Sequence, residues 1–145
     1  MKKLLLILTL AFSFLVQLPE LVTAKQDFPN NESKSFTDAN TFYEQLDKKI
    51  YKEYKNSAYS IRKKILFKDV PNAIWTFNQK TKNGCQAKED YENANINPNR
   101  QVYFLGTFSQ NNDEEFHKYT VIDAETKQEL LGGTSYHHYD DPYKK

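Results

Sequence analysis

The C-terminal stretch TSYHHYDDPYKK, residues 134–145, gathers side chains that could bind a metal ion. It holds His137, His138, Asp140 and Asp141, and imidazole and carboxylate groups are common metal ligands. Adjacent residues of a strand point to opposite faces, so His137 and His138 cannot bind one ion together if the strand continues through them. A dedicated site therefore needs a ligand from a second element.

The preceding strand contains His117 and could supply that ligand. If 115–123 and 128–136 pair as a tight hairpin, His117 lies within a few residues of His137 across the hairpin. A metal site of His117, His137 and Asp140 is then geometrically possible. The alternative is a solvated C-terminal tail with histidines at a strand edge, and we expect no cofactor.

The single cysteine, Cys85, raises the possibility of thiol chemistry. Cys85 with His117 and an aspartate could form the nucleophile, base and orienting group of a thiol-dependent enzyme. Reactive cysteines need pre-organised, electropositive surroundings, whereas Asn83-Gly84-Cys85 predicts a flexible, exposed position. One cysteine excludes an internal disulfide, so the other roles are a disulfide-linked dimer or an incidental thiol.

Acidic clusters lie at residues 113–115 and 140–141. General acid catalysis needs one carboxyl partly buried, and both clusters fall in predicted turns or in the tail. The sequence contains no Gly-rich phosphate loop, no Gly-x-Ser-x-Gly motif and no His-Glu-x-x-His pair. These patterns predict a protein that is not an enzyme.

The ten tyrosines exceed what a small core can hold with satisfied hydroxyl groups, so some are expected at the surface. Exposed tyrosine and tryptophan are favoured at recognition surfaces. The candidate binding residues are Trp75, Tyr119, Tyr136, His137 and Tyr139, with Trp75 expected near Tyr136 and Tyr139 and with a protein or a glycan as the ligand. The alternative is that these aromatic residues serve only as strand formers that pack and snorkel.

The elements that must position these residues follow from hydrophobic periodicity. Ala39, Phe42, Leu46, Ile50 and Tyr54 recur at steps of three and four, which predicts one long amphipathic helix over 38–55. About four to five strands follow, expected at 59–68, 73–78, 101–108, 115–123 and 128–136. One helix followed by antiparallel strands predicts an α+β domain of two layers.

Two finer features accompany this order. Gly132-Gly133 inside the last predicted strand suggests a bulge or a close backbone approach. Residues 79–100 form a long loop, which in a compact domain is often functional or disordered.

The first 24 residues have the three parts of a secretory signal. Lys2 and Lys3 form the positive region, Leu4 to Val16 form the apolar region, and cleavage is expected after Ala24. The apolar run is shorter than the roughly 18 residues of a membrane-spanning helix. We therefore expect a secreted chain with a flexible leader at 25–35, a single domain at 36–145 and no membrane span after cleavage.

The charge balance argues against polyanionic partners. The signal removes two lysines and one glutamate from 20 basic and 19 acidic residues, which leaves 18 of each. Nucleic-acid binding rests on a surplus of Lys and Arg on one face, and adhesion to membrane surfaces needs a polybasic patch. We expect neither nucleic acid nor a membrane surface as the partner.

The segment KYTVIDAETKQELLGG, residues 118–133, resembles the last hairpin of PepSY-type and related cystatin-like secreted bacterial domains. In these, a strand ending in a Val-hydrophobic-Asp segment turns into a strand that starts with leucine. Asp123 can bond ahead to the turn amides, and Lys127 stands where the usual pattern has glycine. The resemblance implies a non-enzymatic protein that modulates hydrolases or acts as an adaptor, although the Gln-x-Val-x-Gly loop of true cystatins is missing.

These observations predict a small exported protein that works by binding a protein partner in the envelope or outside the cell. Inhibition of an extracellular hydrolase is one version. The alternatives are a thiol-dependent enzyme using Cys85 and His117, and a structural surface component that self-associates through Cys85 or an exposed edge strand.

Overall fold

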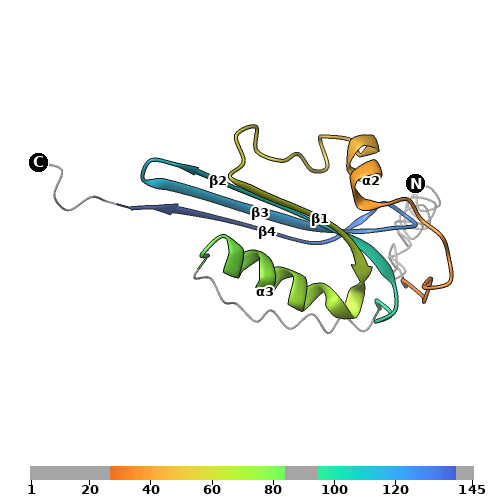
Figure 1. Cartoon of the computed structure of the whole chain (residues 1–145). Coiled ribbons are helices and arrows are strands. Elements are labelled where there is room, and N and C mark those ends of the chain that lie inside the picture. Colours follow the sequence, from red (N-terminus) through yellow and green to blue (C-terminus); the bar gives the residue numbers. More distant parts are fainter. Residues whose placement is uncertain (1–26, 84–94, 140–145) are drawn as a thin grey trace, which may run out of the picture.

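The computed structural model describes residues 27–83 and 95–139, in which four strands form one antiparallel sheet (Figure 1). The elements in chain order are α2 (Ala39–Gln45), β1 (Tyr59–Leu66), the 3-10 turn η1 (Phe67–Asp69), α3 (Val70–Lys80), β2 (Gln101–Asn111), β3 (Glu114–Asp123) and β4 (Glu129–His138). The predicted α+β class and antiparallel sheet are confirmed. No helix in the described part of the chain is both long enough and apolar enough to cross a membrane.

The sheet is a meander in which each strand pairs with its neighbour in the chain, in the order β1-β2-β3-β4. Gly106 of β2 lies between Ile61 of β1 and Tyr119 of β3, and Tyr119 also faces Gly133 of β4. A Cβ at Gly133 would lie 2.5 Å from the Tyr119 ring, so the close neighbour of this glycine is a side chain and not the backbone that was expected. The irregularity in register lies nearby, opposite Val121 and Ile122.

The turn between β3 and β4 is built as the sequence predicted. The Asp123 carboxylate accepts the backbone N–H groups of Glu125 at 3.1 Å and Thr126 at 2.7 Å. Lys127 has a φ of 64°, the left-handed conformation that glycine adopts most easily. Local side-chain and backbone chemistry therefore fixes this turn.

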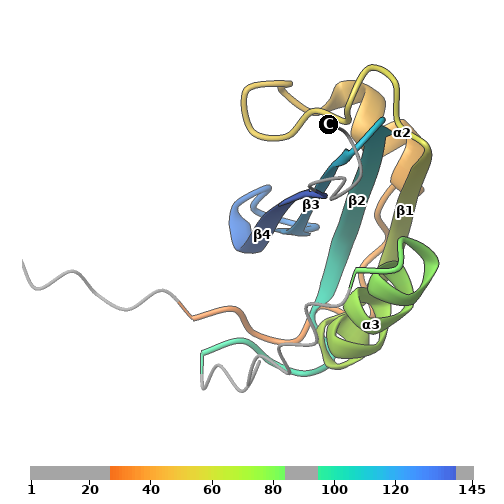
Figure 2. The same cartoon turned by 90° about the vertical axis from the view of Figure 1, so that its left-hand side faces the viewer.

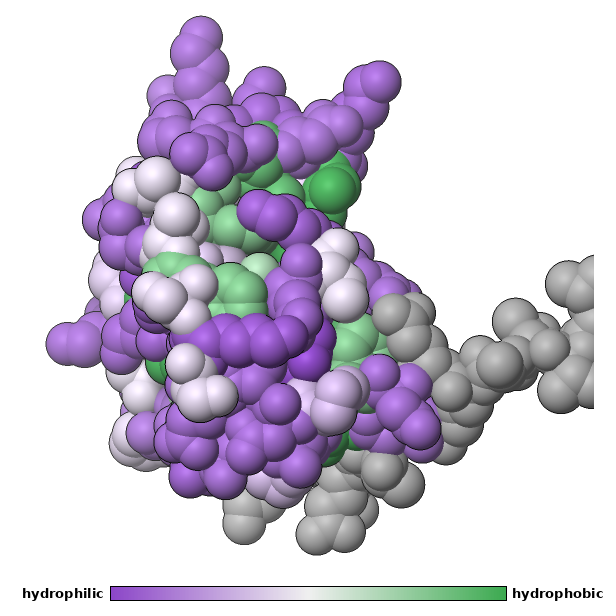
Figure 3. Space-filling model, turned by 90° about the vertical axis from the view of Figure 1, so that its right-hand side faces the viewer, coloured by the Kyte–Doolittle hydropathy of each residue, from purple (hydrophilic) through white to green (hydrophobic). Residues whose placement is uncertain are grey.

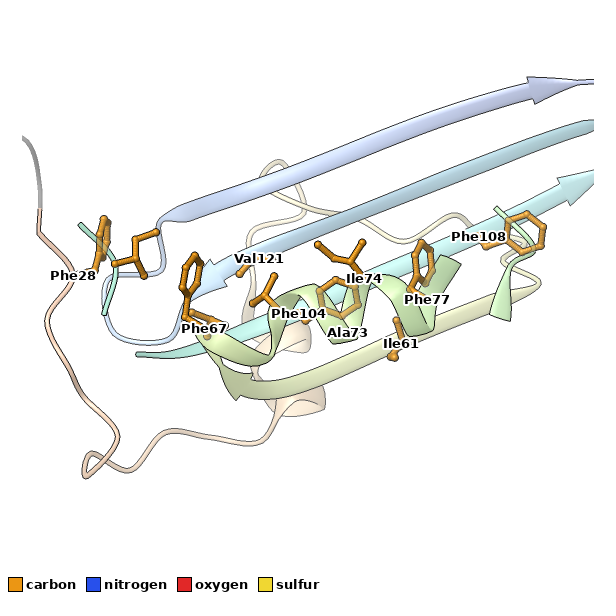
Figure 4. Packing of buried hydrophobic residues seen from close by; sticks show 12 residues of the cluster. Phe28, Ile61, Phe67, Ala73, Ile74, Phe77, Phe104, Phe108 and Val121 are labelled. Atoms are coloured by element: carbon orange, nitrogen blue, oxygen red, sulfur yellow. The ribbon is translucent and has the colours of Figure 1, made fainter. Parts of the chain in front are cut away.

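The larger core lies between the sheet and α3 (Figure 4). Phe104 and Val121 lie side by side on neighbouring strands, and Phe77 of the helix packs over this face with its ring 6.3 Å from that of Phe104. Gly106 makes room for the helix, since a Cβ there would lie 3.0 Å from Phe77 and 2.9 Å from Ile61. Close packing thus places α3 across the middle of the sheet.

The opposite face of the sheet is covered by α2 and the non-helical segment 46–58 (Figure 2). Phe42 of α2 stacks on Tyr103 of β2 with ring centroids 3.7 Å apart, and Leu105 and Ile122 are fully buried beside them. Hydrophobic residues remain visible in a recess in the upper half of the molecule, among hydrophilic side chains (Figure 3). The sheet is therefore the middle of three layers, where two layers were expected.

The strand predicted at 73–78 is wrong, because these residues belong to α3. Val70, Ala73, Ile74 and Phe77 are buried at steps of three and four, which is the spacing of one helix face. Pro71 stands in the first turn of the helix, where its missing N–H costs nothing. The expected order, with the helix before all strands, is corrected accordingly: α3 lies between β1 and β2.

The long helix predicted over 38–55 is also wrong, since α2 ends at Gln45. The Asp47 side chain and carbonyl accept backbone N–H groups of the following residues and form a turn. Beyond that turn the chain crosses the sheet without helical structure, which buries Tyr51 and leaves Ile50 45% exposed. The periodic pattern identified several buried residues correctly but assigned a helical conformation to a segment that is not helical after Gln45.

The segment predicted as a flexible leader, 25–35, is held against the sheet in its described part. Phe28 is buried and forms a parallel bridge with Ile96. Asn31 is 2% exposed, and its side-chain oxygen accepts the Gln101 N–H at 2.6 Å. The expectation that this segment has no core to join is therefore wrong for these residues.

Several predictions concern residues outside the described ranges. They are the signal with its cleavage after Ala24, residues 84–94 of the long loop, and the tail from Asp140. They stay predictions.

Candidate functional site

The candidate site is the distal end of the β3–β4 hairpin, residues 113–118 and 134–139, which lie away from the Asp123 turn (Figure 1). Because side chains alternate along a strand, this end has two different surfaces. Phe116 and Tyr136 point to the α2 side, while His117 and His137 point to the α3 side. Each surface is described in turn.

Three aromatic rings form a row on the α2 side: Tyr54, Phe116 and Tyr136, here called the aromatic row. The Tyr54 and Phe116 ring centroids are 6.1 Å apart, and those of Phe116 and Tyr136 are 5.0 Å apart. Tyr136 is 53% exposed, and the other two are half-buried. The row therefore offers solvent a continuous aromatic surface across β3 and β4.

Polar groups fix the ends of the aromatic row. The Tyr136 hydroxyl donates to Glu114 Oε1 at 2.8 Å, and this hydrogen bond raises the pKa of the phenol. At the other end, Lys118 Nζ lies 4.8 Å from the Tyr54 ring centroid and donates to the Lys52 carbonyl at 2.5 Å. Burial, with a smaller contribution from the charge of Lys52, lowers the pKa of Lys118. A cation and a carboxylate thus flank the rings.

On the α3 side, His117 is almost fully buried, at 2% exposed. Its Nε2 lies 3.3 Å from the Thr81 carbonyl, so the neutral ring donates from Nε2. Its Nδ1 is buried and has no hydrogen-bond partner among residues 27–83 and 95–139. Its ring contacts those of Phe108 at 4.6 Å and Phe77 at 6.4 Å, and burial lowers the pKa of the imidazole. His117 is therefore a core residue held in the neutral form.

His137 and Tyr139 complete the α3 side of the distal end. The ring centroids of His117 and His137 are 6.0 Å apart, which confirms the predicted approach across the hairpin. The Tyr139 hydroxyl donates to Glu115 Oε2 at 2.9 Å, and this bond raises the phenol pKa. Tyr139 is 54% exposed.

The predicted metal site brings together only two of its three members within the described residues. His117 and His137 are neighbours, and Asp140 lies outside the described ranges. No group of three or more His, Cys, Asp or Glu residues suited to a metal ion occurs among 27–83 and 95–139. The third ligand that a metal site needs is thus not found in this part of the chain.

The predicted thiol site has one described member. Cys85 lies outside the described residues, and His117 is buried with its Nε2 engaged by Thr81. A general base must reach the proton it removes in a plausible substrate pose. A histidine enclosed by two phenylalanines and a helix end is poorly placed for that task.

The five predicted binding residues do not form one patch. Trp75 is 58% exposed on α3, whereas Tyr119 is half-buried and stacks on Phe104 at 5.9 Å. Tyr136 and the pair His137 and Tyr139 lie on opposite faces of the sheet. The expectation that Trp75 neighbours Tyr136 and Tyr139 is therefore corrected, because the tyrosines lie on two faces of the sheet and Trp75 lies on α3.

The prediction omitted Tyr54 and Phe116, which the structure places beside Tyr136. The sequence held only a partial signal for Phe116, because the predicted tight hairpin places it opposite Ser135, one residue from Tyr136. The register shift between Val121 and Ile122 brings it opposite Tyr136. Tyr54 carried no such signal, since its place depends on a segment that was expected to be helical.

No protein-family model matches the chain, and no curated protein and no solved structure matches it either. The function must therefore be argued from the residues of the site. The hairpin resemblance to PepSY-type and cystatin-like domains stays a prediction.

Proposed function

We propose that this chain is a small exported, non-enzymatic protein that binds a protein partner through the aromatic row. The observation that carries this proposal is the contiguous, partly exposed arrangement of Tyr54, Phe116 and Tyr136. Tyrosine supplies a large contact area with few rotatable bonds, and it is enriched among the residues that dominate binding energy. Inhibition of an extracellular hydrolase is one form that such binding takes.

The hydrogen bond from Tyr136 to Glu114 supports the proposal. The Tyr136 hydroxyl oxygen lies 2.8 Å from Glu114 Oε1, which restrains the side chain while the residue remains 53% exposed. A side chain that is already ordered loses less conformational entropy when a partner binds. The aromatic row is thus prepared for contact in the free protein.

The choice of a protein partner rests on the balance of charges. The row is bordered by Lys118 on one side and Glu114 on the other, so it presents no field of one sign. Nucleic acid requires a surplus of positive charge, which this surface lacks. Mixed polar groups around an aromatic centre are typical of protein interfaces.

The proposal is tested with the chain displayed on, or added to, the cells that produce it, followed by chemical cross-linking and identification of bound proteins. Tyr136→Ala removes the most exposed ring of the row. Trp75→Ala is the matched control, because Trp75 is similarly exposed and lies on α3. We expect a partner that binds the wild type and Trp75→Ala and binds Tyr136→Ala about 30-fold more weakly, as for a residue that contributes roughly 2 kcal/mol.

Inhibition of a hydrolase is tested by measuring the activity of that enzyme. If the partner is a hydrolase, the wild-type chain lowers its activity, and Tyr136→Ala does so only at higher concentration. A partner that binds equally to all three chains, or a row-dependent ligand that proves to be a glycan, contradicts the proposal.

A further inference from the structure

The two edges of the sheet carry different residues. The edge strand β1 holds Arg62, Lys63 and Lys64 in its centre. The other edge strand, β4, runs for ten residues, Glu129–His138, without lysine, arginine or proline. Natural sheets protect exposed edges with such charged residues or prolines, because an unprotected edge pairs with other strands. One edge of this sheet is therefore protected and the other is not.

The backbone of β4 shows which groups face outward. The Tyr139 N–H donates to the Asp113 carbonyl at 2.8 Å, so this position faces β3. In an antiparallel pair the groups that face the neighbour alternate along the strand. The outward positions are therefore Gly132, Thr134, Tyr136 and His138, and no strand in the described part of the chain pairs with that edge.

The side chains at these four positions leave the edge accessible. All four residues are exposed and lie on the α2 side of the sheet. Two of them are glycine and threonine, which give little steric hindrance to an approaching strand. The middle of the edge, at Gly132 and Thr134, is thus accessible in its backbone and its side chains, while His138 lies 3.9 Å from the Asp113 carboxylate.

We propose that β4 pairs antiparallel with β4 of a second copy of this chain, around a two-fold axis at Thr134. A second copy is favoured by the sizes of the side chains along the strand. Tyr136, which is 53% exposed, and Gly132, which has no side chain, stand equally far on either side of Thr134. Antiparallel pairing of identical strands around Thr134 therefore sets each tyrosine ring opposite a glycine, whereas parallel pairing in register sets ring beside ring.

The position of the two-fold axis follows from the length of strand that can pair and from the room beside Gly132. An axis at Thr134, near the middle of β4, aligns residues 130–138 with the same residues of the second copy. It places Tyr136 of each copy opposite Gly132 of the other, on the same face. The Glu129 carboxylate, which lies 2.5 Å from where a Gly132 Cβ would be, then meets the positive edge of that ring.

The proposed dimer buries a small area, so we expect it to be weak. An interface made by one strand and its copy lies at the low end of interface areas, and a dissociation constant in the micromolar range is expected. The dimer also brings the two aromatic rows onto one continuous face. Self-association is measured with the purified chain alone, so its failure is distinguishable from failure of the proposed partner binding.

The test uses the fact that a residue on a two-fold axis faces itself. The full chain is studied by sedimentation equilibrium from about 1 to about 200 µM, a range that spans weak association. Reducing agent and a Cys85→Ser background exclude a disulfide-linked dimer. The variants are Thr134→Lys, Thr134→Glu and, as the control on α3, Gln79→Lys, which adds the same charge at an exposed position.

We expect the wild type and Gln79→Lys to form dimers, and each Thr134 variant alone to associate at least about 10-fold more weakly, because like charges are opposed. An equimolar mixture of Thr134→Lys and Thr134→Glu should recover dimers, since opposite charges then face each other. A wild type that stays monomeric up to the highest concentration overturns the proposal. So does a dimer that both variants leave intact, or a mixture that fails to recover.

Discussion

Arg100 and Asp123 form a buried, two-pronged ion pair that closes one end of the sheet. Arg100 Nε lies 2.6 Å from Asp123 Oδ2, and Nη2 lies 2.8 Å from Oδ1, with both side chains at most 3% exposed. Burial raises the pKa of Asp123, but the hydrogen bonds from Arg100 and Thr126 outweigh it and hold the pKa below its usual value. The same carboxylate also fixes the β3–β4 turn, so one residue joins two parts of the fold.

Replacing Asp123 by Asn is expected to destabilise the protein by about 3 kcal/mol, because it leaves the buried Arg100 charge with only the partly exposed Glu125 carboxylate, 3.1 Å from its Nη1. Urea unfolding followed by circular dichroism measures this change. The control is Lys34→Ala, which breaks an ion pair with Glu125 whose side chains are 55% and 34% exposed and should cost less than about 1 kcal/mol. Equal losses in the two variants would show that burial of the Arg100 pair is unimportant.

His117 makes the stability of the fold sensitive to mild acid. Burial lowers its pKa in the folded state, so below about pH 6.5 the unfolded chain binds a proton that the folded chain does not. Stability is therefore complete above this pH and falls as the pH drops, by up to about 1.4 kcal/mol per pH unit. Unfolding curves between about pH 7.5 and about pH 5.5 measure it, above the range in which most carboxylates titrate.

The matched variant is His117→Gln, which cannot take up a proton in that range and retains a side-chain N–H donor. It should show a much smaller pH dependence, whatever its stability at neutral pH. The same slope in both proteins would assign the pH dependence to another group.

Tyr51 carries a buried hydroxyl that has no hydrogen-bond partner within the part of the chain that the structure describes. Tyr51→Phe removes this group and should stabilise the protein by about 1 kcal/mol, the order of the desolvation penalty of an unpaired polar atom. The opposite sign is expected for Tyr43→Phe, because the Tyr43 hydroxyl accepts the Glu53 N–H at 3.2 Å. Thermal unfolding of the two variants distinguishes these effects, and a loss of stability in both would contradict the account of Tyr51.

Gly106 sets how closely α3 approaches the sheet. Gly106→Ala puts a Cβ within about 3 Å of Ile61 and Phe77 and should destabilise by about 1–3 kcal/mol through overpacking. Gly132→Ala is the control, since there the nearest atom belongs to the flexible Glu129 carboxylate, and a change within about 0.5 kcal/mol is expected. Unfolding midpoints that shift equally would show that the helix adjusts freely.

The β3–β4 hairpin was predictable because its information is local. Asp123, Thr126 and Lys127 specify the turn within five residues, and the two strands pair outward from it with one register shift, between Val121 and Ile122. The approach of His117 to His137 could be predicted for the same reason. Its burial could not, because that depends on Phe77 and Thr81 of a helix that had been predicted as a strand.

The errors arose where a short sequence fits two periodicities. Residues 73–78 place Ala73, Trp75 and Phe77 on one face of a strand, and only the wider window from Val70 shows the helical spacing. The opposite error occurred after Gln45, where apolar residues at helical steps continue beyond the turn at Asp47. Tyr54 reaches the aromatic row through that non-helical segment, so the row itself was not predictable from local patterns.

The N-terminal segment is joined to parts of the chain that are made much later. Arg100 donates to the Pro29 carbonyl at 2.8 Å across 71 positions, and Asn31 donates to Glu125 across 94. A growing chain therefore leaves residues 28–34 without these partners throughout the synthesis of β1 and α3, and their contacts with Glu125 form only when β3 and its turn have emerged. The first part of the domain to be made is among the last to be fixed in place.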